Sequence, residues 1–251
     1  MWLIGSALVM IFMTLLWAFL YKRTNAGLVD IGWTLSFALA ALVAIILGDA
    51  GTVKKAIFAL MVFPWSLRLA YYLYSRFDAK VEDPRYTKIK KGWGEDRGGL
   101  KMLLMFLFQA ALVALISIPF YLIANDPAMG LLLPGFLVVT FGWMGEMIAD
   151  NQLTRFKANP ENEGKVMDKG LWAYSRHPNY FFEWIVWIGF TLSALFLDYG
   201  YLSLVSFGLI SYLLMGLSGV RLTEEQLAES KGEAYEEYKR RVPAFFPNLK
   251  F

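Results

Sequence analysis

One short stretch, SRHPNYFFEW at residues 175–184, gathers an arginine, the chain's single histidine, an asparagine and a glutamate directly before a strongly apolar segment. Pro178 suits the first turn of a helix, so the positive end of a helix dipole is expected beside Arg176. Such an arrangement can bind an anion such as a phosphate. A helix end capped by Ser175 or His177 at a membrane interface would explain the same residues without a ligand.

Other polar side chains recur at helical spacing within or beside apolar segments, where ionisable groups are costly and suggest function. These sets are Arg68, Tyr72 and Arg76; Glu146 and Asp150; and Asn179 and Glu183. Residues four apart share one face of a helix, so each set forms a polar stripe. Asp30 adds a carboxyl group near the start of another apolar segment. Ion pairs between helices and a ligand pocket both explain these stripes, and the two explanations are compatible.

The composition is that of a membrane protein, with 57% hydrophobic residues, 18% charged residues and a mean hydropathy of +0.46. The absence of cysteine excludes disulfides, thiolate metal sites and a cysteine nucleophile. A single histidine argues against a histidine-based metal site, so we predict no metal. We also predict no nucleic-acid partner. There is no dinucleotide-binding GxGxxG after a strand and no Walker loop, so any cofactor is expected outside a Rossmann domain.

The apolar runs are long enough to cross a bilayer as helices. The seven expected spans are 2–20, 27–47, 55–75, 102–124, 130–149, 179–197 and 201–219. We therefore predict an all-α integral membrane protein of seven transmembrane helices, with residues 1–251 forming a single membrane domain. The largest loops of that domain are 76–101 and 150–178, and a tail covers 220–251.

The distribution of positive charge predicts the orientation. All of the 24 Lys and Arg residues except Lys54, Lys55 and Arg68 fall in segments that seven spans place on one side. The positive-inside rule then puts the N-terminus outside and the C-terminus in the cytoplasm. Attraction to anionic lipids explains most lysines of loop 76–101. Arg85, beside the proline of EDPRY, is a more specific candidate for binding a phosphate.

The motifs EMIADNQLTRFK and KGLWAYSRHPNYFFEWIVWIG, within residues 146–189, resemble those of the membrane-embedded steroid 5-alpha-reductase-like family, particularly its bacterial members. The resemblance is weaker at 64–86 and weakest before residue 60. It implies seven helices and NADPH bound from the cytoplasm between helix ends. It also implies hydride transfer to a carbon–carbon double bond conjugated to a carbonyl, and a bacterial inner membrane with the active site facing the cytoplasm.

Residue by residue, the resemblance implies that Asp150 lies near the cofactor at the end of the fifth span. Asn179 and Glu183 match the family's Asn-x-x-x-Glu, and Lys157 stands where the family has a phosphate-binding arginine. Together with the neighbouring basic and aromatic side chains, the expected cofactor residues are Arg68, Arg76, Arg85, Asp150, Lys157, Arg176, His177, Asn179, Tyr180 and Glu183.

The catalytic groups depart from that family. The steroid enzymes polarise the substrate carbonyl with a tyrosine on the third helix and a glutamate on the second. Trp65 stands at the tyrosine's position here, and Asp30 falls near the glutamate. We expect Asp30 to be the carbonyl-polarising acid or proton donor if burial keeps it protonated. Tyr72 is a second candidate donor. The substrate would be hydrophobic and enter from the bilayer; steroid, isoprenoid, quinone-like and acyl groups all fit.

Two alternatives remain open at this stage. Isoprenylcysteine carboxyl methyltransferases and related phospholipid methyltransferases also carry RHPxY at a helix start and paired glutamates like those of TEEQL at 223–227. They bind S-adenosylmethionine, so a methyltransferase acting on a lipid or small thiol is the second hypothesis. A lipid-binding or scaffold protein without enzymatic activity is the third. Whatever the function, the tail 220–251 reads as an amphipathic helix followed by an aromatic stretch, and such a helix could lie on the inner leaflet.

Overall fold

The computed structural model describes residues 1–21, 25–78, 80–93, 99–217 and 219–248. Every regular element among these residues is a helix, which confirms the all-α prediction. Six helical stretches in the described chain are long and apolar enough to cross a membrane, as an integral membrane protein requires. They are Trp2–Leu20, Leu28–Leu47, Thr52–Ser75, Leu100–Asn125, Leu132–Ala158 and Gly200–Lys231, the last passing residue 218.

Contacts between residues divide the chain into two compact units. Unit 1 comprises residues 1–136 and 191–206, and unit 2 comprises residues 137–190 and 207–251. The prediction of a single membrane domain over 1–251 stays a prediction.

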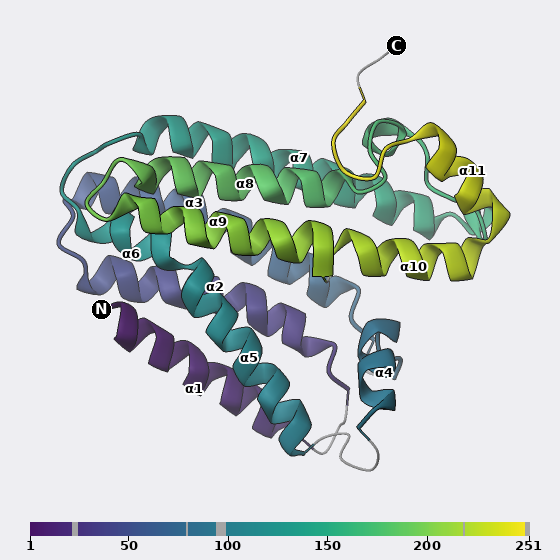
Figure 1. Cartoon of the computed structure of the whole chain (residues 1–251), viewed down its shortest axis with the longest axis horizontal. Helices are drawn as coiled ribbons and strands as arrows, with labels where there is room; N and C mark the ends of the chain where they lie inside the picture. Colours follow the sequence, from purple (N-terminus) through teal and green to yellow (C-terminus); the bar gives the residue numbers. More distant parts are fainter. Residues whose placement is uncertain (22–24, 79, 94–98, 218, 249–251) are drawn as a thin grey trace. The chain divides into compact units, whose positions relative to one another are not determined.

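Unit 1 is built from the helices of the first half of the chain (Figure 1). They are α1 (Trp2–Leu20), α2 (Leu28–Leu47), α3 (Thr52–Ser75), α4 (Pro84–Lys91), α5 (Leu100–Ile116) and α6 (Ile118–Asn125). α2 packs against α3 and α1, and α1 packs against α5. Phe37 joins the core of this unit through ring contacts with Trp65 and Phe120.

The expected span 102–124 is interrupted between α5 and α6. Pro119 has no backbone N–H and cannot bond to the carbonyl four residues earlier. That carbonyl, on Leu115, instead accepts a hydrogen bond from the Ser206 hydroxyl at 2.9 Å. The break at Ser117 is therefore a proline kink whose freed acceptor is satisfied within unit 1.

Unit 2 contains the helices that carry most of the predicted site. They are most of α7 (Leu132–Ala158), most of α8 (Pro178–Leu195), much of α9 (Ser203–Tyr212), the π-helical turn Leu213–Leu217, α10 (Val220–Lys231) and α11 (Glu233–Arg241). Two short 3₁₀ turns, Pro160–Asn162 and Gly170–Ala173, lie between α7 and α8, and a third, Gly200–Leu202, belongs to unit 1.

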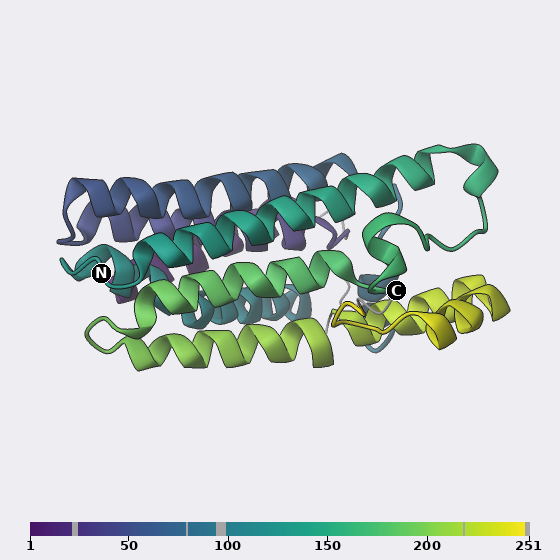
Figure 2. The same cartoon turned by 90° about the horizontal axis from the view of Figure 1, so that it is seen from above.

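Two glycines allow α7 and α8 to approach closely, and both views of the ribbon show the helices side by side (Figures 1 and 2). A Cβ at Gly142 would lie 2.8 Å from the backbone nitrogen of Val186 and 2.9 Å from the carbonyl oxygen of Phe182. A Cβ at Gly145 would lie 2.3 Å from the Phe182 ring. Small residues that permit such backbone contact are typical of helix pairs in membranes. This packing places the polar ends of α7 and α8 within hydrogen-bonding reach.

The last two expected spans differ in detail from the structure. α8 is helical where 179–197 was expected, but it is not among the six stretches that meet the length and hydropathy requirement. After the expected end at residue 219, the tail contains the helices α10 and α11, in agreement with the helix predicted from its amphipathic pattern. The count of seven spans and the orientation stay predictions.

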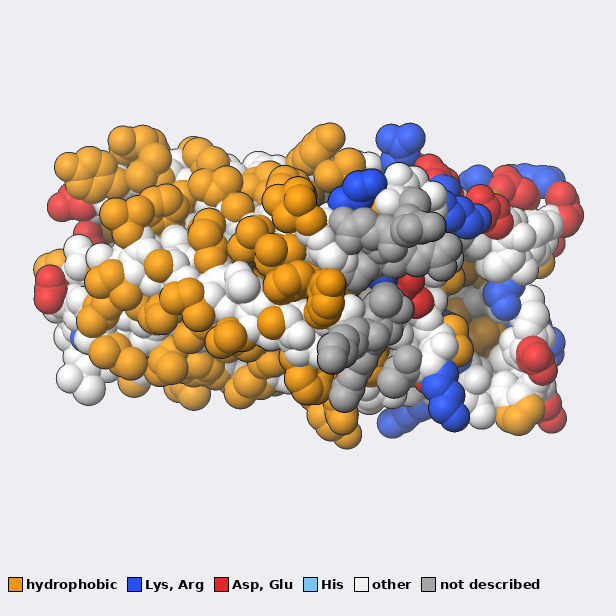
Figure 3. All heavy atoms as spheres, turned by 90° about the horizontal axis from the view of Figure 1, so that it is seen from below, with side chains coloured by type: hydrophobic (Ala, Val, Ile, Leu, Met, Phe, Trp, Pro, Cys, Tyr) orange, Lys and Arg blue, Asp and Glu red, His pale blue; other side chains and the backbone are white. Residues whose placement is uncertain are grey.

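Exposed apolar side chains agree with a lipid environment. On α1, Leu3, Ile11 and Phe19 are 73%, 55% and 61% exposed. On the face drawn in Figure 3, hydrophobic side chains spread over a large part, and most Lys, Arg, Asp and Glu side chains gather in another, with a few Asp and Glu side chains at the far edge of the hydrophobic part. Apolar patches of this extent indicate contact with a membrane.

Candidate functional site

The packing of α7 on α8 brings Asp150 and Asn179 together. The Asn179 side-chain amide donates to the Asp150 carboxylate, with 3.3 Å between Nδ2 and Oδ1. Asp150 is only 2% exposed, although it lies near the polar end of α7. The structure thus joins two of the residues expected to bind a cofactor, across two helices and 29 residues of sequence.

One turn further along α8, Glu183 is held by a buried aromatic residue. The Trp187 indole N–H donates to Glu183 Oε1 at 2.9 Å, and Trp187 is fully buried. On α7, Glu146 lies one turn before Asp150 and is 4% exposed. Unit 2 therefore contains two buried carboxyl groups, on Glu146 and Asp150, and burying such groups is costly enough to suggest a function.

Arg176 is bound to the protein through each of its three nitrogen atoms. Nε and Nη2 donate to the two oxygens of Glu224 at 2.9 and 2.7 Å. Nη1 donates to the carbonyls of Lys239 and Val242 at the C-terminal end of α11, where helix carbonyls need outside partners. Burial opposes the charge of Arg176, but the hydrogen bonds and charge of Glu224 raise its pKa above the ordinary value. A phosphate could reach most of these donors only by displacing protein acceptors.

Glu224 accepts two more hydrogen bonds and connects three segments of unit 2. His177 Nε2 lies 2.7 Å from Glu224 Oε1, and the Tyr235 hydroxyl donates to the same oxygen at 2.6 Å. Burial, followed by the bond to Glu224, raises the pKa of Tyr235, so the hydroxyl remains a donor. The His177 ring stacks on Tyr180, with 5.5 Å between centroids and 9° between planes. The RHPNY stretch is therefore fastened to α10 and α11.

The segment after α11 completes this arrangement. The Arg176 backbone N–H donates to the Pro243 carbonyl at 2.9 Å, and the Ser175 hydroxyl donates to the Phe245 carbonyl at 2.8 Å. The Asn248 backbone N–H donates to the Tyr174 carbonyl at 2.9 Å. Hydrogen bonds between the backbone of residues 243–248 and residues 174–176 therefore hold the segment directly before α8.

The apolar side of α11 faces the protein. Its buried residues Tyr235 and Tyr238, with Val242 directly after the helix, form a cluster with Val166, Leu227 and Ala228. The Tyr238 hydroxyl donates to the Trp172 carbonyl at 2.5 Å. An amphipathic pattern that suggested contact with the inner leaflet is thus explained for α11 by packing within unit 2.

A second polar cluster lies in unit 1, where the N-terminus of α4 meets α2. Asp83 caps α4 by accepting from the Arg85 backbone N–H at 2.8 Å, and Pro84 occupies the first turn. The Arg85 guanidinium bonds to Asp83 and, through Nη2, to Asp30 Oδ2 at 2.8 Å. The Tyr86 hydroxyl donates to Asp30 Oδ1 at 2.5 Å. Asp30 therefore acts as an acceptor for both neighbours.

The pKa values of two groups in this cluster are shifted. Burial tends to raise the pKa of Asp83, but the hydrogen bonds and charge of Arg85 outweigh it and lower that pKa. Burial, reinforced by Asp30, raises the pKa of Tyr86 well above its ordinary value. Tyr86 is therefore a protonated donor, and Asp83 is ionised down to unusually low pH.

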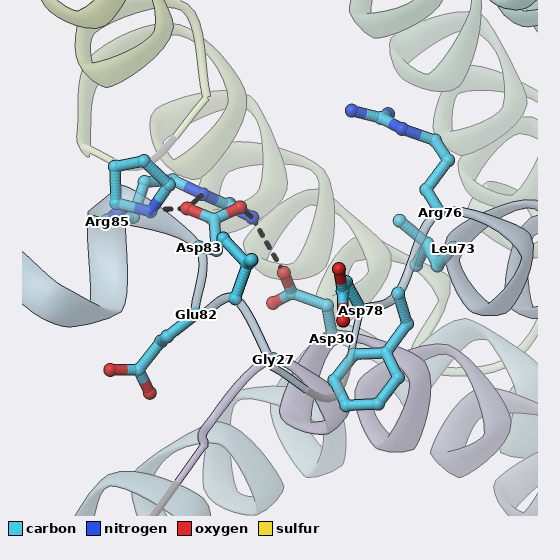
Figure 4. A pocket seen from close by; sticks show the side chains of 11 residues that line it. Gly27, Asp30, Leu73, Arg76, Asp78, Glu82, Asp83 and Arg85 are labelled. Carbon is cyan, nitrogen blue, oxygen red and sulfur yellow. Dashed lines mark hydrogen bonds and ion pairs between the residues drawn. The ribbon is translucent and has the colours of Figure 1, made fainter.

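A cavity of about 260 Å³ opens beside this cluster. Figure 4 shows Asp30, Asp78, Asp83 and Arg85 on its wall, with Arg76 across from them. Arg76 donates to the Tyr72 hydroxyl at 3.0 Å and its guanidinium lies 5.2 Å from the centre of that ring. Three residues predicted to be catalytic or cofactor-binding (Asp30, Arg76 and Arg85) therefore line one cavity in unit 1.

Two other residues expected to bind the cofactor lie elsewhere, on α3 and α7. Arg68 is half-buried in α3 of unit 1, and Lys157 is exposed near the end of α7 in unit 2. Their assignments to the cofactor, and those of Asp30 and Tyr72 to catalysis, stay predictions. Among the described residues no group of three or more His, Asp or Glu side chains could hold a metal ion.

Sequence reasoning missed Glu224, Tyr235 and Tyr86 as members of these clusters. Glu224 was noted within TEEQL, and Tyr86 follows Arg85 in EDPRY, but neither motif indicates its partner. Arg176 and Glu224 are 48 residues apart, and Tyr86 and Asp30 are 56 apart. All three residues lie in segments expected outside the spans, where burial was not predicted, so the sequence carried no signal for them.

The helices and polar clusters define a polytopic α-helical membrane protein. The family model "Protein of unknown function (DUF1295)" matches residues 16–242, so the chain belongs to that family. The chain is also similar to the "Uncharacterized protein C594.04c" of Schizosaccharomyces pombe (strain 972 / ATCC 24843), with 26% identity covering 98% of this chain and 79% of the yeast protein. No solved structure matches the chain significantly.

Proposed function

We propose that this protein is an NADPH-dependent reductase of a carbon–carbon double bond in a lipid-soluble substrate. The observation that carries the proposal is the hydrogen bond between Asn179 and Asp150, one turn from Glu183 in unit 2. The resemblance to steroid 5-alpha-reductase-like proteins assigns these three residues to NADPH binding. The contact of Asn179 with Asp150 across α7 and α8 supports a common role for these two residues.

The side chains available in unit 2 fit such a cofactor. An asparagine amide can donate two hydrogen bonds and accept others, and the hydrogen bond to Asp150 uses one donor of Asn179. Carboxylates such as Asp150 and Glu183 can accept from ribose hydroxyls or a carboxamide. When bound, NADPH would supply the hydride. In this proposal Asp150 and Asn179 bind and orient the cofactor, and Arg176 supports the start of α8.

Ligand-dependent stability of the purified protein in detergent tests this proposal. NADPH at about 100 times its dissociation constant should stabilise the folded protein by about 2.7 kcal/mol, which raises the melting temperature. Asn179→Ala and Asp150→Asn should abolish that rise at the same concentration. Asn151→Ala is the matched control, because Asn151 is an exposed neighbour on α7. An unchanged NADPH response in both site variants would remove the site assignment.

The second candidate is an S-adenosylmethionine-dependent methyltransferase, and one observation supports it. Arg176 and His177 of RHPNY bond directly to Glu224 of TEEQL, and the methyltransferases share both motifs. The same melting experiment separates the candidates. A rise with S-adenosylmethionine and none with NADPH would reverse their order.

We further propose seven spans, with the N-terminus outside, the C-terminus in the cytoplasm and a bacterial inner membrane as the location. The absence of native cysteine allows single-cysteine labelling. Ser230→Cys, in α10, should react with an impermeant maleimide only in inverted vesicles, and Met129→Cys only in intact spheroplasts. Labelling of both from the same side would contradict the orientation.

A further inference from the structure

The two ring nitrogens of His177 have different surroundings. Nε2 lies 2.7 Å from Glu224 Oε1, and the side chain is 2% exposed. The same carboxylate receives Nε and Nη2 of Arg176 and the hydroxyl of Tyr235. An ionised carboxylate can only accept hydrogen bonds, so the proton between His177 and Glu224 belongs to Nε2.

The charges of Arg176 and Glu224 balance each other without a proton on Nδ1 of His177. Arg176 already supplies the positive charge that balances Glu224, through two parallel hydrogen bonds. A protonated His177 would add an unbalanced positive charge in a buried position, which is unfavourable. With Nε2 protonated, Nδ1 carries a lone pair. Nδ1 makes no hydrogen bond within the residues that the structure describes.

We propose that Glu224 is a positioning residue that holds His177 as the Nε2–H tautomer, so that Nδ1 is offered as an acceptor to an N–H or O–H group of the bound ligand. Tyr180 contributes by stacking on the imidazole, which limits rotation of the ring. The partner of one ring nitrogen commonly decides the role of the other. The identity of the ligand as NADPH rests on the proposed function, whereas the tautomer does not.

The single histidine of the chain makes the tautomer directly measurable. In protein labelled with [¹⁵N]histidine, long-range ¹H–¹⁵N correlation spectra distinguish a protonated ring nitrogen from one with a lone pair. At neutral pH we expect a proton on Nε2 alone. A proton on Nδ1 alone, or on both nitrogens, would overturn the proposal, and this measurement on the wild-type protein needs no variant to fold.

Glu224→Gln tests whether Glu224 causes the tautomer. A glutamine amide can donate to Nε2 as well as accept from it, so both tautomers should become populated. Glu225→Gln, the matched control, changes the adjacent glutamate, which pairs with Arg221 at 3.4 Å in an exposed position, and should keep the wild-type spectrum. Glu224→Asp, which retains a carboxylate, should restore a single tautomer. A wild-type pattern in Glu224→Gln would show that Glu224 does not position His177.

NADPH tests the role of Nδ1. Addition of NADPH should shift the Nδ1 resonance of the wild-type protein more than that of Nε2. If NADPH raises the melting temperature but leaves Nδ1 unchanged, the acceptor role is wrong while the proposed function stands. If NADPH does not raise the melting temperature, the proposed function fails, and the tautomer in the wild type and Glu224→Gln still decides the role of Glu224.

Discussion

Arg176 in unit 2 and Arg85 in unit 1 were both expected to bind phosphate, and the structure gives them different surroundings. Arg176 bonds to Glu224 and to two backbone carbonyls through Nε, Nη1 and Nη2. Arg85 bonds to Asp30 and Asp83 through Nε and Nη2, whereas its Nη1 makes no hydrogen bond to the described residues. Arg85 also lines a cavity of about 260 Å³.

The comparison shows that residue type alone does not distinguish a structural arginine from one able to bind a ligand. The two kinds of arginine are distinguished by how many of their hydrogen-bond donors are already bonded to the protein. Displacing a buried acceptor leaves it unsatisfied, at a cost of about 1–3 kcal/mol, so Arg176 is better suited to fastening helices than to binding phosphate. Arg85 retains donors beside an open space.

The largest effect is expected at Arg176. Arg176→Ala removes the counter-charge of Glu224 from a mostly buried cluster, and breaking such a pair costs about 3–5 kcal/mol. Thermal unfolding in detergent should show a large fall in melting temperature. Arg221→Ala is the control, because its exposed pair with Glu225 should contribute about 0–1 kcal/mol. If the two variants lowered the melting temperature equally, Arg176 would be no more important for stability than the exposed Arg221.

The packing that joins Asp150 to Asn179 should be nearly as sensitive. At Gly142→Ala the new Cβ would meet backbone atoms of α8, which cannot move aside like a side-chain tip, and overpacking of this kind costs about 1–3 kcal/mol. Gly208→Ala makes the same change in α9 with no heavy atom within 4 Å. It should be neutral or stabilise by about 0.5–1 kcal/mol. If Gly142→Ala unfolds at the same temperature as the wild type, the close approach of α7 and α8 is not required.

A smaller effect is expected in the unit 1 cluster. Tyr86→Phe removes the hydroxyl bonded to Asp30 and should cost about 1 kcal/mol, because Arg85 still balances the carboxylate. Tyr71→Phe, at a residue 73% exposed on α3, should change the melting temperature very little. A loss as large as that of Arg176→Ala would mean that both clusters are equally structural.

The smallest effect concerns pH and Asp83. Its pKa is lowered in the folded protein, so its contribution to stability is complete above the ordinary value of 3.8 and is lost as pH falls through the lowered value. Asp83→Asn keeps a capping side chain but has no charge to lose. Below about pH 4 the melting temperature of the wild type should therefore approach that of the variant. The stability lost by the wild type should be less than about 1 kcal/mol, because the pair of Asp83 with Arg85 is partly exposed. A constant difference at acid pH would contradict this contribution.

The sequence predicted much of the local structure and little of the long-range pairing. Hydropathy identified the apolar helices because a bilayer requires about 20 apolar residues in succession. Pro178 correctly indicated the start of α8, and Pro119 accounts for the kink that the run 102–124 concealed. The burial of the apolar side of α11 was not foreseen, because an amphipathic pattern fits a lipid surface and a protein surface equally.

In the clusters, helical spacing correctly put polar residues on common faces but could not select their partners. Asp150 and Asn179 meet because Gly142 and Gly145 bring two helices together, and no spacing rule connects these residues. Arg176 pairs with Glu224, although both arginine–phosphate and arginine–carboxylate contacts suit a guanidinium. The choice depends on tertiary contacts across 48 residues.

The bonds from residues 243–248 to the start of α8 impose an order on synthesis. Ser175 and Arg176 leave the ribosome long before Pro243 and Phe245, which supply their carbonyl acceptors. Until then, the start of α8 lacks the contacts that hold it in the mature protein. The segment before α8 therefore acquires its mature hydrogen bonds only after residues 243–248 have been made, when all the preceding apolar helices have already been synthesised.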